Sequence, residues 1–116
     1  MANMPSRPQV AYKFGGFVLN PADKQLLREG KTVALPPKVF DTLLLLVESQ
    51  ARLVQKDDFL KRVWPDSFVE EVALAHCISH LRKALRDGTQ GYTFIETVPK
   101  RGYRFVVGSQ KLKLKT

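Results

Sequence analysis

Two neighbouring stretches decide the fold of this chain: AHCISHLRKALR at residues 75–86 and FIETVPKRGYRF at residues 94–105. Around the first stretch, apolar residues recur at spacings of four, three and four, at Leu74, Ile78, Leu81 and Leu85. This spacing places them on one face of a helix, which we predict from about Val72 to Arg86. Asp87 and Gly88 follow directly and predict a glycine C-cap.

The second stretch is typical of a β-hairpin. Two aromatic and β-branched runs predict strands at Tyr92–Val98 and Tyr103–Val107, joined by a turn that begins at Pro99. The turn carries two cations, Lys100 and Arg101. We expect Gly102 to adopt a backbone angle that other residues resist. We also expect Tyr103 and Phe105 to pack the hairpin onto the preceding helix.

Polar and basic side chains occupy the other side of the predicted helix. They are His76, Ser79, His80, Lys83 and Arg86, with Arg82 on a flank. Arg82 and Arg104 have a second interpretation, because either could pair internally with Glu96 or Asp87.

Positive charge is concentrated in the part of the chain that contains the predicted helix and hairpin. The chain has 19 Lys and Arg against 11 Asp and Glu, a formal charge of +8. Residues 76–116 hold nine of the basic and two of the acidic residues, whereas residues 55–75 hold three and five. One strongly basic surface is what a polyanionic partner requires, although many solvated surfaces are basic for no specific reason.

The first part of the chain predicts a small antiparallel sheet of three or four strands. Alternating apolar residues and turn signals favour strands at Val10–Phe14, Phe17–Leu19, Gln25–Arg28 and Thr32–Leu35. Pro36 and Pro37 then open an amphipathic helix that ends near Gln50. After a short extended segment at 54–56, a second helix is predicted over 57–63 and stopped by Pro65. The fold class is therefore α+β.

The 116 residues fit one domain, which we place at residues 10–108. Residues 1–9 are expected to form a flexible tail, and residues 109–116 a basic tail or linker stub. The alternating Lys and Leu of 111–115 leave a late strand open as well. The Met start and the basic C-terminal end leave open that the chain is the N-terminal part of a longer protein, which could be membrane-anchored.

No apolar run approaches the roughly 20 residues that span a bilayer, so we expect no membrane segment within this chain. The single Cys77 cannot form an internal disulfide, which favours a reducing cytoplasm.

Catalytic and metal-binding interpretations find little support. His76 and His80 have the i, i+4 spacing of half a zinc site, but the chain has no third histidine. Cys77 with His80 could form a nucleophile–base dyad, yet nothing supplies an orienting third group. No P-loop, Rossmann glycine pattern or paired-carboxylate spacing occurs. We therefore expect no catalytic residue, no metal and no cofactor, and a protein that is not an enzyme.

Four motifs together resemble a known family. They are Leu35-Pro36-Pro37-Lys38, Phe59–Pro65 (FLKRVWP), Ile78–Leu85 (ISHLRKAL) and Phe94–Phe105 (FIETVPKRGYRF). On these motifs residues 10–108 are similar to the OmpR/PhoB-type DNA-binding domain, the output domain of signal-transduction regulators. The similarity is greatest to its CadC/ToxR-like branch, which has no receiver domain.

The resemblance implies a winged helix-turn-helix: an N-terminal antiparallel sheet, a three-helix core and a C-terminal hairpin called the wing. It also implies binding to promoter DNA, often as a tandem homodimer on direct repeats, and contact with RNA polymerase through the loop 64–71. One departure concerns the helix face, where relatives often have arginines and this chain has Ser79 and His80. Arginine is the usual bidentate reader of guanine, so the resemblance does not define the DNA sequence that is read.

We therefore predict sequence-specific binding to double-stranded DNA by a bacterial transcription regulator. The helix 72–86 would enter the major groove, and the wing 98–103 would lie on the minor groove or the backbone. The predicted contacts are His76, Ser79, His80, Arg82, Lys83, Arg86, Lys100 and Arg101. The alternative is a winged helix that binds a protein partner and has little specificity for DNA.

Overall fold

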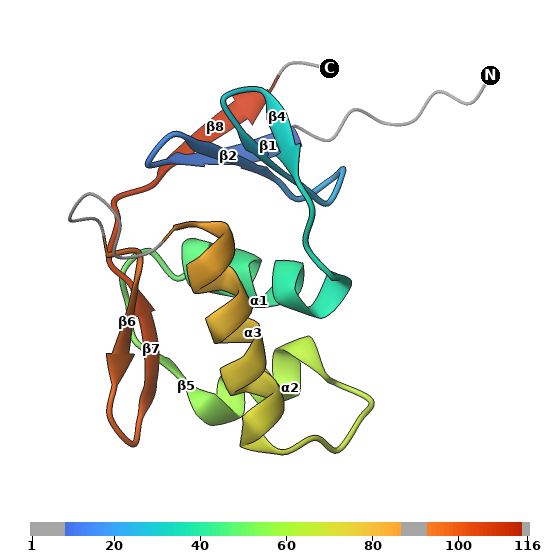
Figure 1. Cartoon of the computed structure of the whole chain (residues 1–116), viewed down its shortest axis with the longest axis vertical. Coiled ribbons are helices and arrows are strands. Elements are labelled where there is room, and N and C mark those ends of the chain that lie inside the picture. Colours follow the sequence, from blue (N-terminus) through green and yellow to red (C-terminus); the bar gives the residue numbers. More distant parts are fainter. Residues whose placement is uncertain (1–8, 87–92, 115–116) are drawn as a thin grey trace.

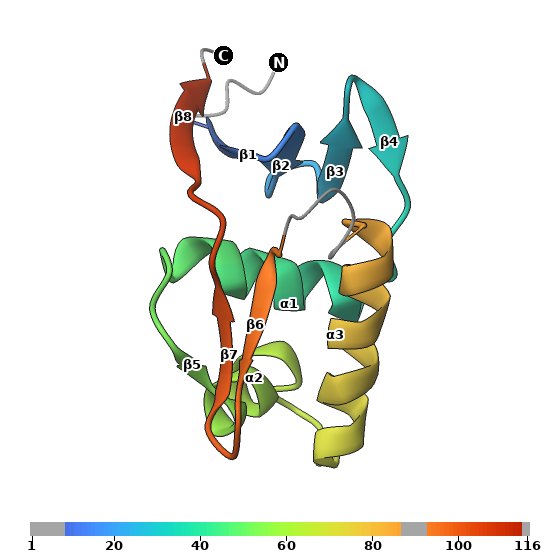
Figure 2. The same cartoon turned by 60° about the vertical axis from the view of Figure 1, so that its left-hand side comes forward.

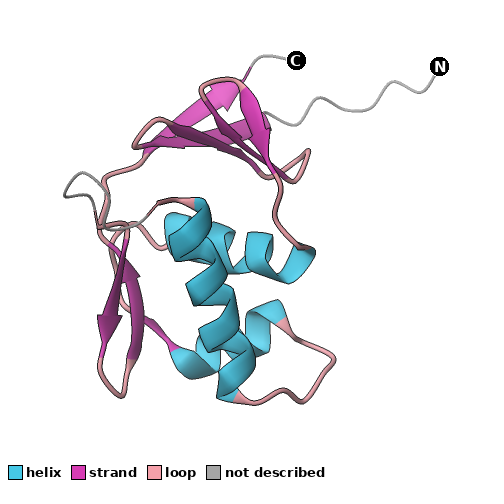
Figure 3. Ribbon diagram, in the orientation of Figure 1, coloured by secondary structure: helices cyan, strands magenta, loops and turns pink. Residues whose placement is uncertain are grey.

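Three helices and two antiparallel sheets make up the computed structural model, which describes residues 9–86 and 93–114 (Figures 1 and 3). The larger sheet lies at one end of the molecule, and the helices and the smaller sheet lie beside one another below it (Figure 2). The α+β class and the winged-helix order of elements predicted from the sequence are confirmed.

The larger sheet has five strands in the order β4-β3-β2-β1-β8. Their bounds are Gln9–Phe14 (β1), Phe17–Asn20 (β2), Gln25–Arg28 (β3), Lys31–Val33 (β4) and Gln110–Leu114 (β8). Each pair of neighbours is antiparallel. The first four strands agree with the predicted ones to within one or two residues.

The fifth strand, β8, decides between the two interpretations of the basic C-terminal segment. It pairs with β1 over five residue pairs, from Gln9 opposite Leu114 to Lys13 opposite Gln110. The alternating residues 110–114 therefore continue the fold as a late strand, and a domain boundary at residue 108 would leave this strand out.

The helices are α1 (Pro37–Glu48), α2 (Lys56–Val63) and α3 (Glu71–Ala84). Pro37 occupies the first turn of α1, where a missing N–H leaves no helical hydrogen bond unmade. Lys38 in the same turn donates from Nζ to the carbonyl oxygen of Val63, at 2.7 Å. One residue of the Leu-Pro-Pro-Lys motif thus ties the start of α1 to the end of α2.

The smaller sheet is the wing with one added strand. Its order is β5-β7-β6, with bounds Val54–Gln55 (β5), Ile95–Val98 (β6) and Gly102–Phe105 (β7). β5 is the short extended segment predicted between α1 and α2. Its pairing with β7 connects the wing to the middle of the chain.

Four phenylalanines connect the two sheets. Phe14 and Phe17 come from the larger sheet, Phe105 ends β7 of the wing, and Phe94 directly precedes β6. The rings of Phe14 and Phe105 meet edge to face with centroids 5.0 Å apart, and those of Phe17 and Phe94 at 5.8 Å. All four are nearly inaccessible to solvent. Burial of such large side chains contributes most per residue to a small core, so the base of the wing is firmly held.

Candidate nucleic-acid interface

The exposed face of α3 carries four of the eight residues predicted to contact DNA. His76, Ser79, His80 and Lys83 are all exposed, at spacings that place them on one side of the helix. The opposite side is buried through Leu74, Cys77, Ile78 and Leu81. The apolar pattern read from the sequence thus fixes which face of α3 is presented to solvent.

The end of α3 differs from the prediction. The helix ends at Ala84 with Leu85 as C-cap, and Arg86 follows with a φ of +56°. The expected glycine C-cap is therefore wrong, because the left-handed position falls on Arg86, two residues before Gly88. Arg86 is exposed just beyond the helix rather than on its face. Asp87 and Gly88 lie outside the described residues.

The wing tip presents two cations on a tight turn. The amide of Arg101 donates to the carbonyl of Val98 at 3.0 Å, and Lys100 has a φ of +65°. Pro99 in second position and a positive φ in third are typical of a type II turn. Lys100 and Arg101 are both exposed. The wing tip lies at the same end of the molecule as the first turn of α3 (Figures 1 and 2).

Gly102 is required at the base of this turn for a reason other than the one expected. Its φ is not positive. Instead, a Cβ at this position would overlap the carbonyl oxygen of Val54 and lie 2.9 Å from the Cα of Gln55. The carbonyl of Arg101 accepts the amide of Lys56 at 3.1 Å in the same region. Gly102 therefore allows β5 to approach the wing closely.

Carboxylates lie close to the wing tip. A shallow depression is lined by Lys56, Asp57, Glu71, Lys100 and Arg101, together with Gln55. Lys56 Nζ lies 3.4 Å from Glu71 Oε2, and both side chains are partly solvated. Exposed pairs of this kind contribute little to stability. The wing tip is thus basic on balance, with acidic groups of α2 and α3 on its inner side.

Arg82 and Arg104 both have partners within the domain. Arg82 Nη2 donates to the carbonyl oxygen of Ile95 at 3.0 Å and to Thr97 Oγ1 at 2.8 Å. Arg104 forms an ion pair with Glu96. Of the two internal pairings left open by the sequence, Arg104 takes Glu96, whereas Arg82 bonds to the wing strand β6.

The wing aromatics make ring contacts to elements besides the helix that was expected. Tyr103 meets Phe59 of α2 edge to face at 5.9 Å, and Phe105 meets Phe14 of β1. Tyr103 also lines a depression with Ala75 and Ser79 of α3. The wing is therefore held by ring contacts to α2 and the larger sheet, while it flanks α3 across this depression.

Cys77 is a buried packing residue. Burial raises the pKa of its thiol, and a hydrogen bond with Thr42 offsets part of that rise. A thiol with a raised pKa has little of the nucleophilic thiolate form. His80, its suggested partner, is exposed to solvent, whereas Cys77 is buried. Within 9–86 and 93–114, no three His, Cys, Asp or Glu side chains gather as metal ligands would.

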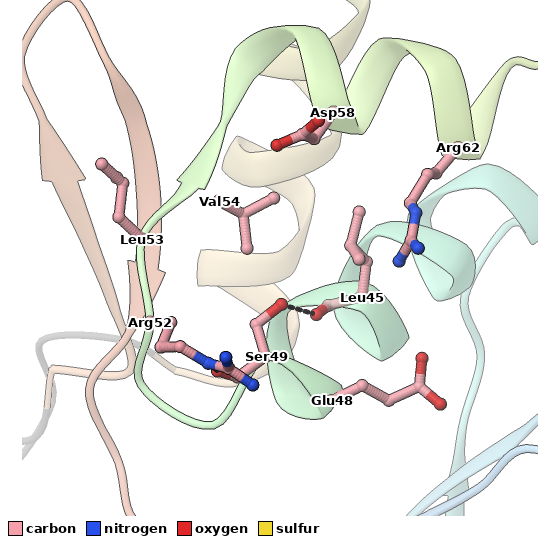
Figure 4. Close-up of a pocket in the computed structure, with 8 residues that line it drawn as sticks. All are labelled: Leu45, Glu48, Ser49, Arg52, Leu53, Val54, Asp58 and Arg62. Atoms are coloured by element: carbon pink, nitrogen blue, oxygen red, sulfur yellow. Dashed lines mark hydrogen bonds between the residues drawn. The ribbon is translucent and has the colours of Figure 1, made fainter.

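A third depression contains no residue of α3. Figure 4 shows its lining residues, which come from the end of α1, the α1–β5 connection, β5 and α2: Leu45, Glu48, Ser49, Arg52, Leu53, Val54, Asp58 and Arg62. Two carboxylates and two guanidinium groups favour no single class of ligand. None of these residues belongs to α3 or to the wing tip, so this depression is not part of the candidate interface.

The arrangement of α3 and the wing agrees with the comparisons. A family model described as "Transcriptional regulatory protein, C terminal" matches residues 30–105. The chain belongs to this family. Its members are transcription regulators and not enzymes, as the sequence predicted.

Individual relatives of the chain are also transcription regulators or their DNA-binding domains. The chain is 39% identical over 94 residues to the transcriptional regulator HilA of Salmonella typhi. The aligned segment covers 81% of this chain but only 17% of HilA. The DNA-binding domain of Escherichia coli CadC has a similar structure, with a TM-score of 0.76 and 30% identity over 91% of this chain and 98% of that one.

A further solved structure is similar and contains DNA. It is the DNA-binding domain of Klebsiella pneumoniae RstA in complex with the RstA box, with a TM-score of 0.69 and 29% identity over 82% of this chain and 95% of that one. This chain thus corresponds to the DNA-binding portion of longer regulators. None of its helices in the described ranges is long and apolar enough to cross a membrane.

Two features of the surface were missed by sequence reasoning. Phe68, in the loop between α2 and α3, is fully exposed. Lys56 joins the cations of the wing tip through tertiary contact. The position of Phe68 in an acidic, proline-initiated loop was a signal that could have identified it, whereas nothing local to Lys56 indicated its neighbours.

Proposed function

We propose that this domain binds promoter DNA with sequence specificity, with α3 in the major groove and the wing on the adjacent minor groove or backbone. A B-DNA major groove about 12 Å wide accepts one helix. The exposed polar face of α3, flanked by a basic wing tip, is the single observation that supports this placement best. The RstA domain, solved on its DNA box, supports it further.

The residues divide into two roles. His76, Ser79 and His80 lie along the middle of the exposed face, where side chains reach base edges, directly or through water. The outer cations mainly neutralise phosphates, and they are Lys83, Arg86, Lys100 and Arg101. Because phosphate contacts release counterions, the affinity should fall steeply with salt.

The first test replaces Arg101 by Ala. We expect weaker DNA binding, and a plot of log affinity against log salt concentration whose slope is smaller by roughly one charge. The measurement is a fluorescence titration at several salt concentrations. Lys24→Ala is the matched control, because Lys24 is an exposed cation on the β2–β3 turn of the larger sheet and belongs neither to α3 nor to the wing.

An Arg101→Ala slope equal to that of the wild type would reject a phosphate contact at the wing. The DNA for this titration comes from selection of bound sequences out of a random pool. Failure to enrich any sequence would favour the alternative, a winged helix that recognises a protein.

We further propose a second contact, to RNA polymerase, through the loop 64–71. Phe68 is fully exposed there, flanked by Asp66, Glu70 and Glu71. Carboxylates repel the DNA backbone, so an acidic loop with an exposed aromatic suits a protein surface. Tandem binding of two domains on direct repeats, and a location on the nucleoid in the cytoplasm, belong to the same proposal.

A further inference from the structure

Arg82 connects α3 to the wing. It lies in the last turn of α3, and its side chain is half-buried. One terminal nitrogen donates two hydrogen bonds to β6, at 3.0 Å to the carbonyl of Ile95 and at 2.8 Å to the hydroxyl of Thr97. The planar guanidinium can make such paired bonds, whereas a lysine ammonium at the same place cannot reproduce its geometry.

One of the two acceptors, the carbonyl of Ile95, lies on the outer edge of the smaller sheet. β6 is the edge strand of the order β5-β7-β6. The carbonyl of Phe94 accepts the amide of Val106, so the carbonyls of even-numbered residues face β7. The carbonyl of Ile95 therefore faces the open edge of the sheet. Thr97 is on the same face of β6 as Ile95, two residues along.

The neighbouring surface makes this connection relevant to DNA. Lys83 and Ser79 of α3 line a depression together with Arg82 and with Tyr103 of the wing. The contacts of Tyr103 and Phe105 fix the wing to α2 and the larger sheet. Within residues 9–86 and 93–114, the two hydrogen bonds of Arg82 join α3 to the wing directly.

We propose that Arg82 is a positioning residue that sets the spacing between α3 and the wing, and that it acts through Ile95 and Thr97 rather than through a phosphate. The proposal rests on the function proposed above. Because α3 and the wing are assigned to adjacent grooves, a change in their spacing would prevent both from binding at once. This assigns Arg82 a role different from that of Lys83, its neighbour in the sequence.

The test uses variants that alter the connection without altering charge. Thr97→Val removes the hydroxyl acceptor, and Arg82→Lys keeps the charge but not the paired donors. We expect each to bind the selected DNA about three- to tenfold more weakly, the usual effect of losing one or two hydrogen bonds. The salt slope should remain that of the wild type. Lys83→Ala, the matched control, should reduce the slope by about one.

A second readout separates positioning from a general loss of stability. If Arg82 holds the wing in place, Arg101→Ala should cost less affinity in the Arg82→Lys background than in the wild type. Lys83→Ala should cost the same in both backgrounds, because Lys83 lies on α3 itself. The double variant Arg82→Lys/Thr97→Val should bind no more weakly than Arg82→Lys alone.

Two results would overturn the proposal. One is wild-type affinity for Thr97→Val and Arg82→Lys, together with a reduced salt slope for Arg82→Ala, which would make Arg82 a phosphate contact. The other is that the affinity costs of Arg101→Ala and Lys83→Ala fall equally in the Arg82→Lys background, together with a lower melting temperature. That result would make Arg82 a stabilising residue only. If the wild type selects no DNA sequence, the proposed function fails first, and this proposal fails with it.

Discussion

At the scale of the residue, Gly102 shows how one missing atom sets the position of the wing. Its lack of a Cβ lets β7 pair with Val54 and Gln55 of β5. β5 leads directly into α2, so the wing is connected to the helices through this contact. The glycine is required for space and not for its backbone angle.

Gly102→Ala should therefore destabilise the domain. The added methyl would overlap the carbonyl oxygen of Val54, and we expect a loss of about 1–3 kcal/mol in the free energy of unfolding, as for other overpacked sites. Gly108→Ala is the matched control, because nothing lies within 4 Å of a Cβ there. Urea denaturation of both variants gives the comparison. Equal stability of the two would show that β5 can move away from β7 at little cost.

At the scale of the element, the wing turn combines strain with charge. Lys100 adopts a positive φ that glycine would adopt without strain. A lysine at this position costs stability but places a cation at the tip of the wing. A second lysine, Lys24, also has a positive φ, of +51°, but it lies on a turn of the larger sheet.

Lys100→Gly should raise stability and weaken DNA binding together. Relief of the positive φ should add about 0.5–1 kcal/mol to the free energy of unfolding. The loss of one phosphate contact should reduce the salt slope by about one. Lys24→Gly should give the same gain in stability with no change in slope. A reduced slope in both variants would mean that net charge, and not the position of Lys100, determines the effect.

At the scale of the whole molecule, the domain has two chemically different surfaces. The face formed by α3 and the wing tip is basic, and the loop 64–71 is acidic with Phe68 at full exposure. Opposite charges are therefore separated on one small fold, and this separation agrees with the two contacts proposed above, one to DNA and one to a protein.

Phe68→Ala should separate these two activities. We expect unchanged stability within about 0.5 kcal/mol, because Phe68 buries nothing in the domain. DNA affinity should also be unchanged, while transcription in vitro from a promoter that carries the selected site should decrease. Val106→Ala, another exposed apolar residue, is the control. Unchanged transcription with Phe68→Ala would contradict a polymerase contact at this residue.

Much of the fold could be predicted because its signals are local. The buried face of α3 follows from apolar spacing, and the wing turn follows from Pro99 and the residues after it. The exposure of His76, Ser79, His80 and Lys83 could be predicted in the same way, because Leu74, Ile78 and Leu81 are buried on the opposite face of α3. Their contact with DNA stays a prediction. The helix end was misplaced, since the left-handed residue proved to be Arg86 and not a glycine.

The sequence by itself therefore determined the order of elements, the exposed face of α3 and the concentration of cations on the last part of the chain. Periodicity and turn chemistry depend on residues within a few positions of one another, so they can be read without a structure. Only the tertiary structure decided the partners of Arg82, the role of Gly102 and the pairing of β8 with β1. Each of these joins segments distant in the sequence, and such contacts depend on how the whole chain packs.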